Sequence, residues 1–238
     1  MRSLAEKGQV IWPLLPINAL MSFYTLLANV GEPFGEKGIG VEQATGVSVL
    51  NEMASVTKNI PEQCFFMDPI NAYEWLASRS DASYVPHLYG YTNYSRDGFR
   101  PHLVKVANIP VLGDTGTVGS TIGGAGIAIS ANIQHADTAL KYAYWIASEE
   151  CQSEIFFKAG GQPANIVAWK DSECNRVANN FFKNTLKTLE SSYLRPRHNG
   201  YMAFQDIGGE LIHAFLAGQK SASITIASIN ENYERSFI

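Results

Sequence analysis

The sequence predicts an α/β fold that is rich in helix, and three observations support this. Residues 126–130, GIAIS, form a short apolar run after a glycine cluster, a pattern typical of a strand. From Asp137 onward the apolar residues recur at helical spacing, as they do in several other segments. Of the 238 residues 46% are apolar, which is enough for a substantial core in one large domain or two small ones.

The first third of the chain contains one strand pattern followed by helix patterns. Residues 9–12 favour a short strand, which ends at Pro13 and Pro16 because proline cannot continue a hydrogen-bonded ladder. Asp68 before Pro69 is typical of a helix start, with the acidic side chain as N-cap and proline in the first turn. We therefore predict helices over residues 17–30, residues 41–58 and from residue 69 onward.

The middle of the chain changes character. Residues 84–94 are aromatic and short of helix formers, which favours a strand leading into a loop, and residues 103–106 favour another strand. Residues 113–121 are rich in glycine and threonine and are the best candidate for a crossing between two lobes.

Helix patterns return in the last part of the chain. Gly160 and Gly161, with Pro163 behind them, are a typical helix end. Residues 193–199 contain a proline and are expected to be extended. The predicted helices cover residues 137–147, 151–159, 175–189, 204–216 and 221–237.

Charge and cysteine content exclude some classes of function. The net charge is −4 and the basic residues are scattered, so the sequence lacks the basic patch of a nucleic-acid-binding protein. Cys64, Cys151 and Cys174 allow at most one disulfide, and free buried thiols are the favoured interpretation. The uncharged run between Lys7 and Glu32 is interrupted by prolines, so we expect no export signal in this chain.

The sequence also lacks the local motifs of common enzymes. It contains no GxSxG, no HExxH and no lysine after its glycines in the manner of a phosphate-binding loop. The five histidines show no metal-ligand spacing with cysteine or aspartate. We therefore predict a protein without catalytic residues, a metal site or a cofactor.

Sugar binding needs side chains that this sequence does contain. Aromatic rings cover the apolar faces of a saccharide, while amides, arginines and bare backbone bond to its hydroxyls. The segment GYTNYSR, residues 90–96, supplies several such groups, but core roles explain Trp12, Tyr91 and Tyr94 equally well. The predicted ligand-binding residues are Trp12, Tyr91, Asn93, Tyr94, Gly123, Gly124, Gly161, Gln162 and Arg197.

Several stretches resemble one known family. GGAGIAIS, then WIASEECQ, then AGGQPA are similar to the late segment of the extracellular solute-binding proteins of sugar ABC importers. The resemblance extends to LRPRHNGY at residues 194–201, to residues 90–96 and to VIWPL at residues 10–14.

That resemblance implies a periplasmic-binding-protein-like fold of type II, truncated so that most of the second lobe and a short return segment of the first are present. Residues 1–118 and 167–238 would form the second, C-terminal lobe, incomplete at its start, and residues 119–166 the hinge strand and helices of the first. The implied function is to bind a sugar or oligosaccharide non-covalently between two lobes and deliver it to the ABC permease. Full-length members of the family are periplasmic or extracellular. Because the family pattern is matched only from within its second lobe onward, this chain resembles a C-terminal fragment.

A second class of function fits the same sequence. The chain could be an interaction module without a small ligand, because an apolar strand that lacks neighbours tends to recruit another strand. In that case residues 126–130 are expected to support a homodimer.

Overall fold

The computed structural model describes residues 1–35 and 38–237, which divide into two compact units. Unit 1 consists of Met1–Tyr89, Asn108–Ile122 and Lys187–Ile238. Unit 2 consists of Gly90–Ala107 and Gly123–Leu186. The division places residues 167–186 with the segment before them. These units are groups of residues in mutual contact, whereas the lobes suggested by the family resemblance are defined by the family pattern. The lobe boundaries therefore remain a prediction.

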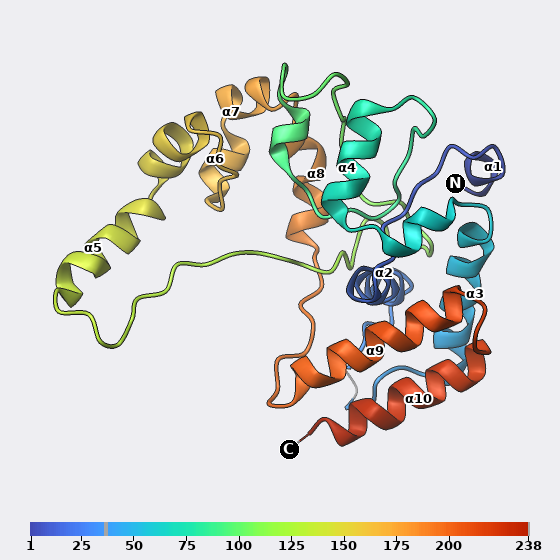
Figure 1. Ribbon diagram of the computed structural model, residues 1–238. Coiled ribbons are helices and arrows are strands. Elements are labelled where there is room, and N and C mark those ends of the chain that lie inside the picture. Colours follow the sequence, from blue (N-terminus) through green and yellow to red (C-terminus); the bar gives the residue numbers. More distant parts are fainter. Residues whose placement is uncertain (36–37, 238) are drawn as a thin grey trace. The chain divides into compact units, whose positions relative to one another are not determined.

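Helix α2 (Pro16–Asn29) forms the centre of unit 1. Every residue from Asn18 to Asn29 is buried, as expected for a helix that is covered on all sides. Helices α3 (Gln43–Thr57) and α9 (Tyr201–Leu216) pack against α2, and α10 (Ala222–Arg235) packs against both of them. Figure 1 shows α2 nearly end-on beside α3 and α9, with α10 along the outer side of α9.

Local signals set the ends of several helices in unit 1. Helix α4 (Pro69–Ser78) begins at the predicted place, where the Asp68 carboxylate accepts the Asn71 backbone N–H at 2.7 Å in a capping box. The Ser221 hydroxyl caps α10 by accepting the Ile224 backbone N–H at 3.4 Å. Unit 1 also contains two short helices that the sequence pattern did not predict, α1 (Arg2–Glu6) and the 3-10 helix η1 (Glu62–Phe66).

Unit 2 is built from short helices. They are the 3-10 helix η2 (Thr92–Ser95), α5 (Ala136–Ile146), the π-helix η3 (Cys151–Phe156), α6 (Ile166–Lys170), α7 (Ser172–Val177) and α8 (Phe181–Glu190), whose last turn belongs to unit 1. The helix predicted over residues 175–189 is therefore two helices. Asn179 and Asn180 separate them in left-handed backbone conformations, which asparagine tolerates better than most residues.

Strand pairing is limited to isolated contacts within the described residues. Val10 pairs with Tyr84 and Thr121 pairs with Tyr193, each in one parallel bridge. The predicted strands at residues 9–12, 84–94, 103–106 and 126–130 do not form ladders. Pro13 ends the pairing of residues 9–12, and none of the described residues forms a bridge with residues 126–130.

The structure also shows the state of the cysteines and the character of the helices. Cys64, Cys151 and Cys174 are free and buried, in agreement with the free-thiol interpretation. Within the described ranges, none of the helices has the length and apolar character needed to cross a bilayer.

One buried amide fixes the glycine- and threonine-rich segment in unit 1. Asn29 has no exposed surface, and its Nδ2 donates to the carbonyl oxygens of Gly116 at 2.8 Å and Val118 at 3.1 Å. Its Oδ1 accepts the backbone N–H groups of Leu112 at 2.5 Å and Gly113 at 3.4 Å. A single side chain thus bonds four backbone groups of residues 112–118.

The end of the same segment is attached one turn earlier on α2. The Thr121 backbone N–H donates to Thr25 Oγ1 at 3.1 Å, and Thr121 Oγ1 donates to the Met21 carbonyl oxygen at 3.1 Å. Between these attachments Gly119 adopts φ +90°, and a Cβ built there would lie 2.4 Å from Cβ of Ala28. Only glycine permits this backbone and this close approach.

Candidate functional site

Two loops of unit 2 bring several of the predicted ligand-binding residues together. The first loop, residues 90–100, contains η2 and the sequence GYTNYSR. The second loop, residues 157–163, follows η3 and contains the sequence AGGQP. We call them the tyrosine loop and the glycine loop.

Hydrogen bonds to backbone carbonyl oxygens hold the tyrosine loop in place. The buried Ser95 Oγ donates to the Val104 carbonyl oxygen at 2.7 Å, and the Val104 N–H donates to the Tyr94 carbonyl oxygen at 3.0 Å. Asn179 Nδ2 also donates to the Ser95 carbonyl oxygen, at 3.0 Å. The loop therefore has a defined backbone although no sheet supports it.

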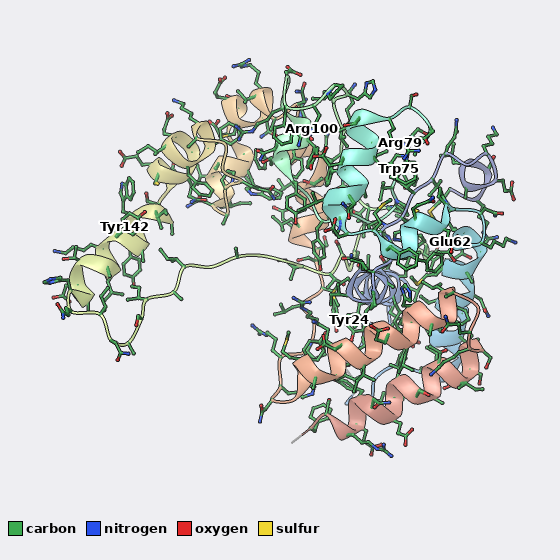
Figure 2. The ribbon with its side chains drawn as sticks, in the orientation of Figure 1. Tyr24, Glu62, Trp75, Arg79, Arg100 and Tyr142 are labelled. Atoms are coloured by element: carbon green, nitrogen blue, oxygen red, sulfur yellow. The ribbon has the colours of Figure 1, made fainter. Side chains whose placement is uncertain are left out.

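The two tyrosines of this loop have different environments. Tyr94 is only 6% exposed, and its ring packs edge-on against Phe99 with 5.1 Å between ring centroids. The Arg100 guanidinium, labelled in Figure 2, lies over the Phe99 ring at 4.4 Å from its centroid. Tyr91 is 40% exposed. The structure thus places Tyr94 in the packing of the loop and leaves Tyr91 as the ring that a ligand could cover.

The glycine loop begins with a helix end. Gly160 adopts φ +95°, and the N–H of Gly161 donates to the Phe156 carbonyl oxygen at 2.8 Å. A Cβ on Gly161 would lie 2.5 Å from the Phe156 ring. The glycine pair therefore permits a tight turn that brings Gln162 close behind the helix, and this agrees with the helix end predicted from the sequence.

Two contacts join the loops. The Thr92 backbone N–H donates to Gln162 Oε1 at 2.9 Å. The Arg96 guanidinium donates to the carbonyl oxygens of Phe157 at 3.0 Å and Gly161 at 3.3 Å, and it lies 4.2 Å from the centroid of the Phe157 ring. Burial lowers the pKa of Arg96 below its usual value, in keeping with a cation whose partners are neutral.

The remaining predicted residues lie elsewhere. Gly123 and Gly124 are exposed in an extended part of unit 2, and a Cβ on Gly124 would meet nothing within 4 Å. Trp12 belongs to unit 1 and is 1% exposed, with its indole N–H donating to Ser22 Oγ at 3.0 Å. Arg197, also in unit 1, is exposed. A ligand role for these four residues stays a prediction.

Two arginines outside the predicted ligand-binding set make structural contacts. Arg96 joins the two loops, and Arg195 in unit 1 donates to Gln205 Oε1 at 2.8 Å. The only signal in the sequence was the position of Arg96 at the end of GYTNYSR. A structural arginine cannot be distinguished from a solvated one when its acceptors are backbone carbonyls far along the chain.

The described part of the chain contains no group of three or more histidine, cysteine, aspartate or glutamate residues that could hold a metal ion. The two loops instead offer an exposed phenol ring, amide groups and backbone carbonyls. Such groups can bind a polar uncharged ligand through stacking and hydrogen bonds.

Solved structures give the fold. The maltose-bound MalE3 protein of T. maritima matches with a TM-score of 0.77 at 21% identity over 95% of this chain. A solute-binding protein of an ABC transporter of Agrobacterium radiobacter, in complex with ribitol, matches with a TM-score of 0.78 at 19% identity over 99% of this chain. The maltotriose-bound MalE domain of Bdellovibrio bacteriovorus matches with a TM-score of 0.70 at 17% identity over 97%.

The chain has the fold of these solute-binding proteins. The match confirms the α/β, periplasmic-binding-protein-like class expected from the sequence. The chain spans 60%, 61% and 60% of the length of the three structures, in the same order. No family model matches this chain, and no curated protein matches it either.

Proposed function

We propose that this protein is the substrate-binding component of an ABC importer and that it binds a carbohydrate or polyol without transforming it. The partners of this function are the sugar or oligosaccharide and the membrane subunits of the permease. The place of action is the periplasm or the cell exterior, where importers collect their substrates.

The observation that carries the proposal is the joined pair of loops in unit 2. The pair contains the half-exposed Tyr91 ring and the amide groups of Asn93 and Gln162, and hydrogen bonds fix the backbone of both loops. Aromatic faces and fixed amides are the groups that sugar recognition requires. Support also comes from the fold neighbours, whose structures contain maltose, maltotriose and ribitol.

Titration of the chain with maltose, maltotriose and ribitol, followed by backbone amide chemical shifts, tests this proposal. Because the loops of unit 2 supply one exposed ring and a few amides, we expect weak binding with a Kd of about 1 mM, or about 4 kcal/mol. The shifted amides should lie in residues 90–100 and 157–163. Tyr91→Ala should abolish the shifts while the chain stays folded, because Tyr91 lies outside the buried core. Saturating sugar that shifts none of these amides would contradict the proposal.

A second candidate function is self-association without a small ligand. Residues 123–130 are extended, mostly exposed and uncharged, and no backbone hydrogen bond joins residues 123–129 to another described residue. Ile127 is 52% exposed. An uncharged apolar segment with unpaired backbone groups is suited to pair with the same segment of a second copy.

Light scattering as a function of concentration tests this alternative. If two copies pair through residues 126–130, the mass should rise toward that of a dimer, and Ile127→Lys should return it to that of a monomer because edge lysines oppose strand pairing. Ile17→Lys, at an exposed isoleucine of α2, is the matched control. A monomeric mass at high concentration would exclude this pairing.

A further inference from the structure

The hydrogen bond between the two loops of unit 2 fixes which way the Gln162 amide faces. The Thr92 backbone N–H can only donate, so the Gln162 atom that it contacts at 2.9 Å must be the carbonyl oxygen. The amide nitrogen therefore occupies the other branch of the side chain. Gln162 is exposed, and its Nε2 has no hydrogen-bond partner within the described ranges. The loop contact thus presents an oriented NH2 group at the surface of unit 2.

Arg96 makes the second contact between the two loops. Its Nη2 donates to two carbonyl oxygens of the glycine loop, those of Phe157 and Gly161, and its guanidinium lies over the Phe157 ring. No ion pair with a carboxylate involves Arg96 in the part of the chain that the structure describes. One guanidinium nitrogen makes both bonds while the planar group stacks on the Phe157 ring, and the ammonium group of lysine has no plane with which to stack. The arginine therefore connects the loops and leaves their own side chains available.

We propose that Arg96 is a positioning residue and that Gln162, oriented by Thr92, is a specificity-determining donor to an oxygen acceptor of the ligand. This inference rests on the proposed carbohydrate function and names the chemistry of one of its contacts. The acceptor is a hydroxyl or ring oxygen of the saccharide or polyol, because an NH2 group donates and does not accept. A donor that is already oriented loses little conformational freedom when the ligand binds.

Two substitutions at Gln162 separate orientation from donation. Gln162→Glu keeps an oxygen that accepts the Thr92 N–H but replaces the NH2 group by a second acceptor oxygen. Gln162→Ala removes both groups. Arg96→Lys keeps the positive charge but loses the planar guanidinium group. Its matched control is Arg176→Lys, because Arg176 is an exposed arginine of α7 in the same unit and pairs with Glu173.

The first measurement is amide hydrogen exchange in the whole chain without ligand. The Thr92 amide should be protected in the wild type and in Gln162→Glu. It should exchange about tenfold faster or more in Gln162→Ala and in Arg96→Lys, because the loops then separate more often. Arg176→Lys should leave the exchange unchanged. Loss of protection in Gln162→Glu, or full protection in Arg96→Lys, would overturn the positioning inference.

The second measurement is titration of the same proteins with maltose, maltotriose and ribitol. Gln162→Glu should bind about tenfold more weakly or worse although its Thr92 amide stays protected, because only the donor is lost. Unchanged affinity in Gln162→Glu would overturn the donor role.

The two measurements also distinguish this inference from the proposed function. If the wild type binds none of the three compounds, the proposed function and the donor role fail together. The exchange pattern then still decides whether Arg96 and Gln162 join the loops. If Gln162→Glu lowers the Tm as much as Gln162→Ala and Arg96→Lys do, its weaker binding would reflect a structural effect and the donor role would fail.

Discussion

Residues 112–121 and residues 123–130 are consecutive parts of one glycine-rich stretch, yet the structure treats them differently. Neither part forms a helix or a strand ladder. The first is attached to α2 by the side chains of Asn29 and Thr25. The second is extended and exposed, and no backbone hydrogen bond joins residues 123–129 to any described residue.

This difference shows that order in such a stretch depends on partners from elsewhere in the chain. Both parts contain glycines and small or β-branched residues, so their local preferences are similar. A glycine-rich segment loses much conformational entropy when it becomes fixed, and buried polar partners can offset that loss. Helix α2 provides these partners at its C-terminal end, where Asn29 and Thr25 lie one turn apart.

The largest expected effect comes from the amide that holds the first part. Asn29→Ala removes a side chain that bonds two backbone N–H and two carbonyl groups of residues 112–118, and it leaves a cavity at a fully buried position. We expect the free energy of unfolding to fall by about 4 kcal/mol, measured by urea denaturation with tryptophan fluorescence. Asn132→Ala removes the same side chain at an exposed position just after the second part and should change it by less than about 0.5 kcal/mol. Equal effects at the two sites would break the comparison.

The next effect compares one glycine from each part. Gly119→Ala introduces a Cβ that meets Ala28 at 2.4 Å and imposes a left-handed backbone on alanine, so we expect a loss of about 3 kcal/mol. Gly124→Ala meets nothing within 4 Å and should be neutral or slightly stabilising, because alanine reduces the freedom of the unfolded chain. Calorimetric Tm values of both variants test the pair, and a destabilising Gly124→Ala would reveal a partner of the second part.

Acid should destabilise unit 1 without acting through this stretch, because its anchors are asparagine and threonine and do not titrate. The ring nitrogens of His87 are enclosed and have no hydrogen-bond partner among the described residues, and the ring lies edge-on to Trp12 at 5.4 Å between centroids. Burial lowers the pKa of His87 to about 4, below its ordinary value of 6.5.

The unfolded chain therefore takes up the His87 proton first, so stability is complete above pH 6.5 and falls as the pH drops toward 4. The loss should reach about 3 kcal/mol at pH 4. Urea denaturation between pH 7 and pH 4 measures it. His87→Phe should remove most of this pH dependence, whereas His102→Phe, at an exposed histidine, should retain it. A wild-type stability that is flat over this range would contradict the assignment.

The helices of unit 1 could be predicted because their signals are local. Apolar periodicity predicted α2 and α3, and the Asp68–Pro69 pair predicted the start of α4. The role of Asn29 could not be predicted, since its partners lie 83 to 89 residues away and no local pattern distinguishes a buried asparagine from an exposed one. The predicted strands depended on neighbours in the same way, and only isolated bridges formed.

The same distinction between local signals and distant partners applies to the candidate site. The residue types of the tyrosine loop and the glycine loop predicted a polar, aromatic surface, and the glycine pair predicted the helix end before Gln162. The contact between the loops joins Thr92 and Gln162, which are 70 residues apart, so the sequence could not show that Gln162 Oε1 is already engaged. For Trp12 the sequence left a core role and a ligand role open, and the structure shows a buried ring whose indole N–H donates to Ser22.

The smallest expected effect tests the outermost anchor of the first part. In Thr121→Val the Oγ1 bond to the Met21 carbonyl oxygen is lost, but that oxygen still accepts from Thr25 Oγ1 at 2.8 Å and the new methyl group fills the same volume. We therefore expect a loss of only about 1 kcal/mol in urea denaturation. Ser130→Ala, at an exposed hydroxyl in the second part, should cause no measurable change. In a double-mutant cycle Thr25→Val and Thr121→Val should couple, because each hydroxyl lies 3.2 Å from the other, and strict additivity would mean that the two threonines hold the segment independently.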